Sequence, residues 1–110
     1  MMNIALEEKE ILEEFACQIR KKLKNNLILI KLFGSKARGD FNKDSDIDIL
    51  IVVNKKTTTV RDEIYNILFS IDPYYEHKVS IILFSLYEYQ KNEEMRSPFI
   101  KHIRLEGIDL

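Results

Sequence analysis

The segment from Leu27 to Val53 most constrains the fold, because two apolar runs stand on either side of a polar stretch. Leu27–Phe33 and Ile47–Val53 are nearly continuous in apolar residues, a pattern typical of strands that are buried on both faces of a sheet. Gly34–Ser45 joins them, is rich in glycine, aspartate, lysine and serine, and is predicted to form a loop with one helical turn after Ser35. We therefore expect two central strands connected by a polar loop.

The rest of the chain shows helical spacing of apolar residues and one further strand-like run. Ser85 and Glu88 have the spacing of a capping box, and Ser97 followed by Pro98 indicates another helix start. Gly107 is expected to end that last helix. The predicted elements are a helix over residues 3–23, strands over 27–33 and 47–53, a helix to about 71, a strand over 79–84, and short helices over 85–94 and from 98 to Gly107.

Length and composition indicate an ordinary globular protein. The chain has 110 residues and a mass of 13.1 kDa, which predicts a single domain over residues 1–110. Its formal net charge of −1 gives no bulk attraction to nucleic acid. Cys17 is the only cysteine, which excludes an internal disulfide. No apolar run approaches the roughly 18 residues that span a bilayer, so we expect a cytoplasmic protein without membrane contact.

Two aspartates stand where the second strand begins. Side chains two positions apart on a strand project from the same face, so Asp46 and Asp48 should lie about 6.5 Å apart on one side of the sheet. Carboxylates at this separation repel each other unless a cation lies between them. Mg²⁺ prefers oxygen ligands and is commonly held by one or two carboxylates together with substrate phosphates. The pair therefore predicts metal-assisted chemistry on a phosphate.

The polar loop contains groups suited to binding that phosphate. Gly34 allows a sharp backbone turn and close approach of a ligand, and Ser35 offers a hydroxyl and a backbone amide. Lys36 and Arg38 are nearby cations for the same phosphates, although Arg38 could instead brace the loop. A P-loop interpretation of Gly34–Asp40 fails, since Asp40 stands where that motif requires lysine.

One motif in this region resembles the signature of the DNA polymerase β-like nucleotidyltransferase superfamily. It consists of Gly34-Ser35, ten intervening residues and Asp46-Ile47-Asp48. The fuller pattern, Gly34–Asp40 with Ser45–Asp48, is similar to its minimal nucleotidyltransferase (MNT) branch. The resemblance implies an α+β two-layer fold, with a small mixed sheet and helices packed mainly on one face. Stand-alone members of this branch are often antitoxins that pair with a helical HEPN ribonuclease toxin and transfer AMP from ATP to a toxin tyrosine.

This resemblance implies that Gly34 and Ser35 hold the nucleotide phosphates, with Arg38 beside them. It also implies that Asp46 and Asp48 are catalytic and bind two Mg²⁺ ions.

The family usually adds a third carboxylate from a later strand, which serves as metal ligand and as base for the attacking hydroxyl. Ser80 stands at the corresponding place here, and Glu76 has the same strand parity if the strand starts early. A tyrosine hydroxyl has a pKa near 10, so losing its base removes an effect of about a hundredfold in rate.

Two classes of function follow from these observations. The first is an enzyme that transfers AMP from Mg-ATP to a protein hydroxyl, such as a tyrosine of a HEPN toxin, and so acts as an antitoxin. The second is a catalytically weak or inactive nucleotide-binding module that neutralises its partner by contact. Modification of a small molecule ranks last, because relatives of that kind generally carry a further substrate-binding domain. Some apolar residues near the C-terminus could also contact a partner or a second copy; they are Phe99, Ile100, Ile103 and Leu105.

Overall fold

The structure is a computed structural model and describes residues 6–39 and 46–110. The expected helix start at Asn3 and the loop residues 40–45 lie outside the described residues. The elements are, in chain order, α1 (Leu6–Leu23), the 3-10 turn η1 (Lys24–Asn26), β1 (Leu27–Phe33), α2 (Ser35–Arg38), β2 (Ile47–Val53), α3 (Thr58–Ile71), β3 (Val79–Ser85), α4 (Leu86–Glu94), α5 (Pro98–Glu106) and β4 (Ile108–Asp109).

Most of these elements match the sequence prediction. The helical turn after Ser35 is present as α2, and the side chain of Ser85 accepts a hydrogen bond from the Glu88 amide in the expected capping box. Ser97 caps α5, with Pro98 in its first turn, and Gly107 ends it. β4 was not predicted, because a two-residue strand carries no periodicity of its own.

The four strands form one mixed sheet in the order β3-β2-β1-β4. β1 pairs antiparallel with both β2 and β4, while β3 pairs parallel with β2. The parallel pairing requires a crossover between β2 and β3, and α3 supplies it. The predicted α+β fold with a small mixed sheet is therefore confirmed.

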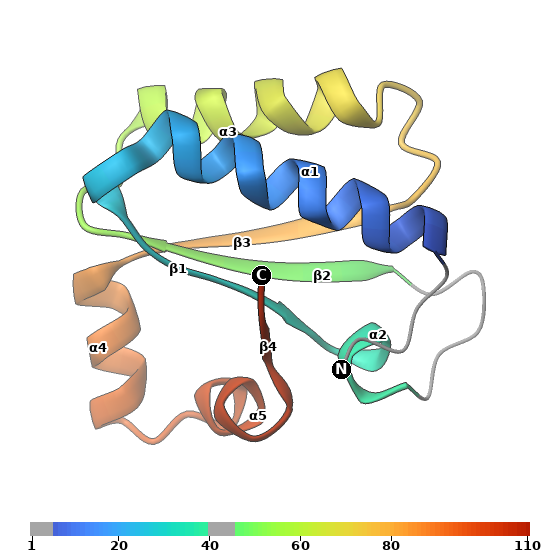
Figure 1. Cartoon of the computed structure of the whole chain (residues 1–110). Coiled ribbons are helices and arrows are strands. Elements are labelled where there is room, and N and C mark those ends of the chain that lie inside the picture. Colours follow the sequence, from blue (N-terminus) through green and yellow to red (C-terminus); the bar gives the residue numbers. More distant parts are fainter. Residues whose placement is uncertain (1–5, 40–45) are drawn as a thin grey trace.

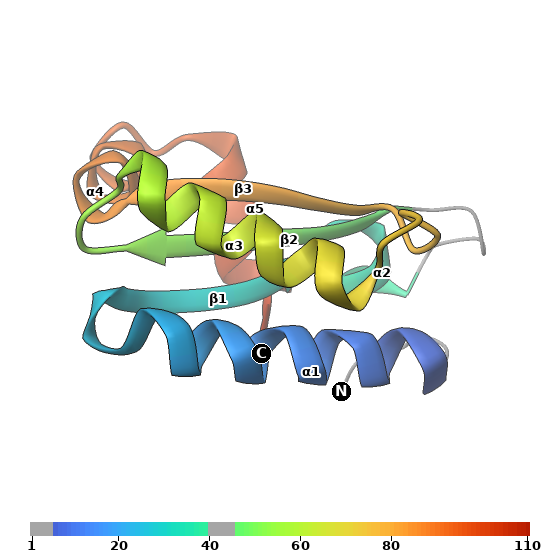
Figure 2. The same ribbon diagram turned by 90° about the horizontal axis from the view of Figure 1, so that it is seen from above.

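The two long helices, α1 and α3, cover one face of the sheet (Figures 1 and 2). Their apolar residues recur three and four positions apart and therefore point toward the strands, where they bury the main core. The buried members of this core are Leu12, Phe15, Ala16, Ile19, Leu23, Ile30, Leu32, Ile47, Ile49, Ile51, Val53, Ile64, Leu68 and Val79.

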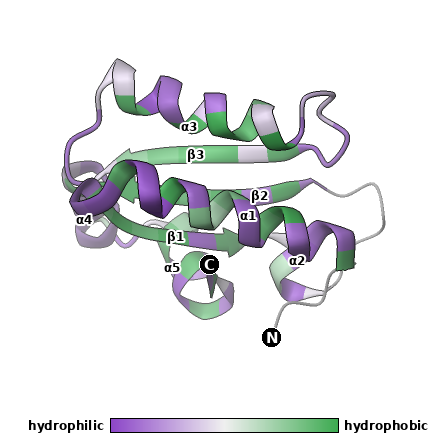
Figure 3. Cartoon of the chain, turned by 45° about the horizontal axis from the view of Figure 1, so that its top comes forward, coloured by the Kyte–Doolittle hydropathy of each residue, from purple (hydrophilic) through white to green (hydrophobic). Residues whose placement is uncertain are grey.

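A smaller core lies on the opposite face, where the short helices α4 and α5 pack (Figure 1). Leu50 and Val52 of β2 contact Ile103 of α5 there. The ring of Phe99 packs edge-to-face against Phe33 at 5.3 Å and Phe84 at 5.8 Å between centroids. Hydrophobic residues run along all three long strands, because helices cover both faces (Figure 3).

This second core accounts for most of the apolar residues that seemed surplus near the C-terminus. Ile100 and Ile103 are buried and Phe99 packs in the smaller core, whereas Leu105 is 86% exposed. Among the described residues, no helix is long and apolar enough to cross a membrane.

Candidate active site

Asp48 lies on the sheet face opposite α1 and α3. Its neighbours Ile47 and Ile49 point into the main core, so the alternation of a strand turns Asp48 to the face on which Leu50 and Val52 contact α5. Asp46 precedes β2 by one residue and is exposed, while Asp48 is partly buried. The two aspartates therefore occupy the end of β2 that adjoins the turn after β1.

Gly34 is held directly against Asp48. Its φ of +78° lies in the region that favours glycine, and a Cβ added at this position would overlap Oδ2 of Asp48. The register explains the proximity, since Phe33 pairs with Asp48 across the antiparallel β1 and β2. The predicted phosphate-binding glycine and the predicted metal-binding aspartate thus meet at one point.

A single helical turn follows Gly34. The Gly34 carbonyl accepts hydrogen bonds from the amides of Ala37 and Arg38, both at 3.1 Å, and the Gly39 amide donates to the Ser35 carbonyl at 2.9 Å. Gly39, at a φ of +84°, ends the turn in the left-handed conformation. Ser35 is therefore the first residue of a helix whose opening amides have no intrahelical acceptor, which is a suitable geometry for phosphate.

The surroundings of Asp48 raise its pKa above the ordinary value. Burial is the largest cause, and the negative charge of Asp46 adds to it, while the positive charge of Arg38 acts in the opposite direction. Two carboxylates on one face, one of them partly buried, favour a bound cation.

Mg²⁺ fits this donor set, since it prefers oxygen ligands and commonly uses one or two carboxylates. Within residues 6–39 and 46–110, no group of three or more His, Cys, Asp or Glu side chains forms a metal site. Asp46 and Asp48 would therefore leave positions for water and substrate oxygens.

Arg38 lies between the aspartates and the C-terminal helix. Its Nη1 donates to Oε2 of Glu106, the last residue of α5, at 3.3 Å, and its charge also acts on Asp48. Both side chains are partly exposed. Arg38 therefore braces the turn against α5, and its positive charge also acts on Asp48, so its expected contact with phosphate stays a prediction.

Lys36 does not belong to this face, and its expected role as a phosphate-binding cation is wrong. Its side chain is fully buried, and Nζ contacts both carboxylate oxygens of Glu8 in α1, at 3.0 and 3.2 Å. Glu8 and Glu106, which hold the two cations of α2, were missed by the sequence reasoning, because they lie 28 and 68 residues away from their partners.

Ser80 stands beside Asp48 on the neighbouring strand. The parallel register pairs Asp48 with Ser80, so both side chains project from the same face. Glu76 cannot substitute from within the strand, because β3 begins at Val79 and Glu76 lies in the preceding turn, where its amide donates to Asp72. The position beside Asp48 thus holds a hydroxyl in place of a carboxylate.

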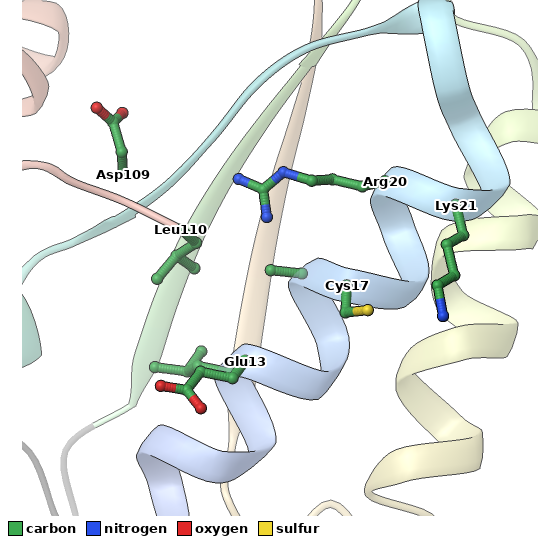
Figure 4. Close-up of a pocket in the computed structure, with 8 residues that line it drawn as sticks. Glu13, Cys17, Arg20, Lys21, Asp109 and Leu110 are labelled. Atoms are coloured by element: carbon green, nitrogen blue, oxygen red, sulfur yellow. The ribbon is translucent and has the colours of Figure 1, made fainter.

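A separate hollow of about 480 Å³ lies between α1 and the C-terminal strand (Figure 4). Leu12, Ala16 and Leu110 contribute apolar surface, and Arg20 and Glu13 lie beside them. None of the residues that line it belongs to the α2 turn or to the aspartate pair, so it is not part of the candidate site.

Comparison with known proteins identifies the family. A family model described as "Nucleotidyltransferase domain" matches residues 11–108. "Putative protein adenylyltransferase MJ0141" of Methanocaldococcus jannaschii is 33% identical over 101 residues, which are 92% of this chain and 96% of that protein. "Putative protein adenylyltransferase MJ0604" of the same organism is 45% identical over 47 residues, 43% of this chain and 47% of that protein.

Solved structures share the fold. A toxin-antitoxin crystal structure with AMP-PNP superposes with a TM-score of 0.55 at 22% identity and covers 88% of this chain and 70% of the matched chain. A mutant of the toxin-antitoxin MntA-HpeT superposes with a TM-score of 0.50 at 23% identity, over 96% and 72% of the two chains. These structures show the shared fold, whereas the match over residues 11–108 and the 33% identical relative show that this chain belongs to the nucleotidyltransferase domain family, of the DNA polymerase β-like type.

Proposed function

We propose that this protein transfers AMP from Mg-ATP to a hydroxyl of a partner protein, a tyrosine of a HEPN-type toxin, and thereby acts as its antitoxin. The observation that carries the proposal is the contact of Gly34 with the Asp48 carboxylate, which brings a phosphate-binding turn and an acidic pair to one point. The 33% identical relative named as a protein adenylyltransferase supports a protein acceptor. The fold shared with toxin-antitoxin structures, one of them with AMP-PNP, agrees with this partner and nucleotide.

The chain's own residues have distinct roles in this reaction. The amides at the start of α2 and the Ser35 hydroxyl bind phosphate oxygens, and Arg38 adds positive charge on the same face. Asp46 and Asp48 would hold Mg²⁺, which when bound supplies positive charge to the phosphate oxygens. The acceptor oxygen attacks the α-phosphorus, the bond from that phosphorus to the β-phosphate oxygen breaks, and pyrophosphate leaves.

The proton of the acceptor hydroxyl must also be removed. Ser80 is a neutral hydroxyl and cannot serve as a base at neutral pH. We therefore assign proton removal to water or to a carboxylate of the partner.

Incubation with ATP labelled at the α-phosphorus, Mg²⁺ and the product of the neighbouring gene tests the proposal. We expect label on the partner, loss of that label when its acceptor tyrosine is replaced by phenylalanine, and no label with the Asp46→Asn/Asp48→Asn variant. Absence of label with the folded wild-type protein counts against transfer.

A second candidate is neutralisation by contact alone, and the position of Ser80 beside Asp48 favours it. This function predicts that the folded Asp46→Asn/Asp48→Asn variant still inhibits the partner's ribonuclease activity. Loss of inhibition in that variant would eliminate it.

A further inference from the structure

We propose that Lys36 is a positioning residue, which uses its ion pair with Glu8 to fix the α2 turn in the geometry that binds nucleotide. The proposal rests on the nucleotide-binding role assigned above to Gly34 and Ser35. It gives Lys36 no contact with ATP, in contrast to Arg38.

The ion pair is buried and well formed. The Lys36 side chain has no exposed surface, the Glu8 side chain is 15% exposed, and Nζ reaches both oxygens of the carboxylate. Burying an ammonium group costs several kcal/mol in general, and a close carboxylate offsets that cost. The contact therefore fixes where Lys36 can lie.

The position of Lys36 determines the position of its neighbours. Lys36 follows Ser35 directly, and Ser35 follows Gly34, whose α-carbon lies against Asp48. α2 has only four residues and is too short to be stable by itself, so contacts with other elements must hold it. A displacement of Lys36 would move the Ser35 amide and the Gly34–Asp48 contact together.

Glu8 provides a rigid attachment for this turn. It lies in the first turn of α1, an 18-residue helix whose Leu12, Phe15 and Ile19 are buried in the main core. The two cations of α2 therefore reach helices on opposite faces of the sheet, Lys36 toward α1 and Arg38 toward α5. Only the Lys36 pair is buried, so solvent screens it less than the Arg38 pair.

The test replaces both charges with apolar groups of similar volume, because removal of one partner alone would leave a buried charge and destabilise the fold. In the Glu8→Leu/Lys36→Met variant we expect the melting temperature to stay near that of the wild type. The dissociation constant for Mg-ATP should rise about tenfold, which corresponds to about 1.4 kcal/mol and is close to the net contribution of one hydrogen bond from the displaced Ser35 amide. Calorimetric titration with Mg-ATP and thermal unfolding measure the two quantities.

Lys9→Met/Glu13→Leu is the matched control, because it makes the same substitutions in an exposed ion pair within α1. It should leave ATP affinity unchanged. Glu8→Gln provides a milder second variant, which keeps a hydrogen-bond acceptor for Lys36 and should weaken ATP binding by a smaller factor.

The outcomes separate this inference from the proposed function. Wild-type affinity in Glu8→Gln, and in the folded Glu8→Leu/Lys36→Met variant, would overturn the positioning role and leave the function standing. Failure of the wild-type protein itself to bind Mg-ATP would overturn both.

Discussion

At the scale of single residues, the site depends on how closely Gly34 approaches Asp48. The positive φ of Gly34 and the lack of room for a Cβ both require glycine at this position. Burial and the negative charge of Asp46 raise the pKa of Asp48, while the positive charge of Arg38, in the turn, opposes the rise. Each of these two residues therefore yields a measurable prediction.

Gly34→Ala should lower the free energy of unfolding by about 1–3 kcal/mol, from backbone strain at positive φ and overlap with Asp48. Binding of Mg-ATP should weaken as well, because the turn must move away from the carboxylate. Chemical denaturation and calorimetric titration measure these effects. In an Asp48→Ala background the same substitution should cost only the backbone strain; an equal cost in both backgrounds would show that the overlap is unimportant.

The raised pKa of Asp48 predicts how stability depends on pH. The folded protein binds the Asp48 proton more tightly than the unfolded chain, so this group's stabilising contribution is complete below its ordinary pKa of 3.8 and is lost as the pH rises through the higher folded value. Without Mg²⁺ at about pH 7, Asp48→Asn should therefore melt at a higher temperature than the wild type, and the difference should shrink toward about pH 4.

Thermal unfolding in EDTA checks this prediction, with Asp62→Asn on the exposed part of α3 as the control that should show no such difference. Millimolar Mg²⁺ should stabilise the wild type and not Asp48→Asn. A wild-type protein that melts above the variant at neutral pH without metal would contradict the expected sign.

At the scale of elements, the parallel register of β3 on β2 decides which side chain faces Asp48. That register pairs Ile47 with Val79 and Asp48 with Ser80. A shift by one residue would turn Ser80 to the main core, so the buried Val79 and the partly buried Ile81, which pack in that core, fix the arrangement. The chemistry available at this position is therefore set by strand pairing.

Ser80→Asp should restore a carboxylate on the same face as Asp46 and Asp48. We expect tighter Mg²⁺ binding and a rise in AMP transfer of about tenfold or more, because a positioned base contributes about a hundredfold or more in many enzymes. Ser80→Asn, which has a similar shape without charge, is the matched control. The test is the rate of AMP transfer, measured with α-labelled ATP and the same partner. A Ser80→Asp rate at or below the wild-type rate would argue against a base at position 80.

At the scale of the whole molecule, the C-terminal segment joins the site to the smaller core and to the edge of the sheet. α5 presents Glu106 to Arg38 and packs its Ile103 on β2, and β4 then pairs with β1 beside it. Gly107 allows this change of direction, because a Cβ there would overlap the carbonyl oxygen of Ile103. Packing of α5 should therefore influence both stability and the site.

Phe99→Ala tests this connection. Loss of the edge-to-face contacts with Phe33 and Phe84 should lower the free energy of unfolding by about 2–4 kcal/mol and the melting temperature by about 10 °C or more. Phe69→Ala, at a residue 54% exposed on α3, should cost less than about 1 kcal/mol. Equal losses in the two variants would show that the smaller core contributes little.

The sequence by itself determined the elements and the choice of candidate site residues. Apolar periodicity, the capping box at Ser85 and the Ser97-Pro98 start are local signals, and they located the helices and long strands correctly. The spacing of Gly34, Ser35, Asp46 and Asp48 resembles the family's signature, and the family model that matches residues 11–108 agrees with that resemblance.

Only the tertiary structure decided the contacts between distant segments. It turned Lys36 inward to Glu8, joined Arg38 to Glu106 and added β4 to the sheet. Each of these depends on strand register or helix packing between residues far apart in the chain, and a single sequence carries no local signal for such pairs. The sequence therefore identified the candidate nucleotide site, while the packing of α1, β3 and α5 around it determined how its residues are held.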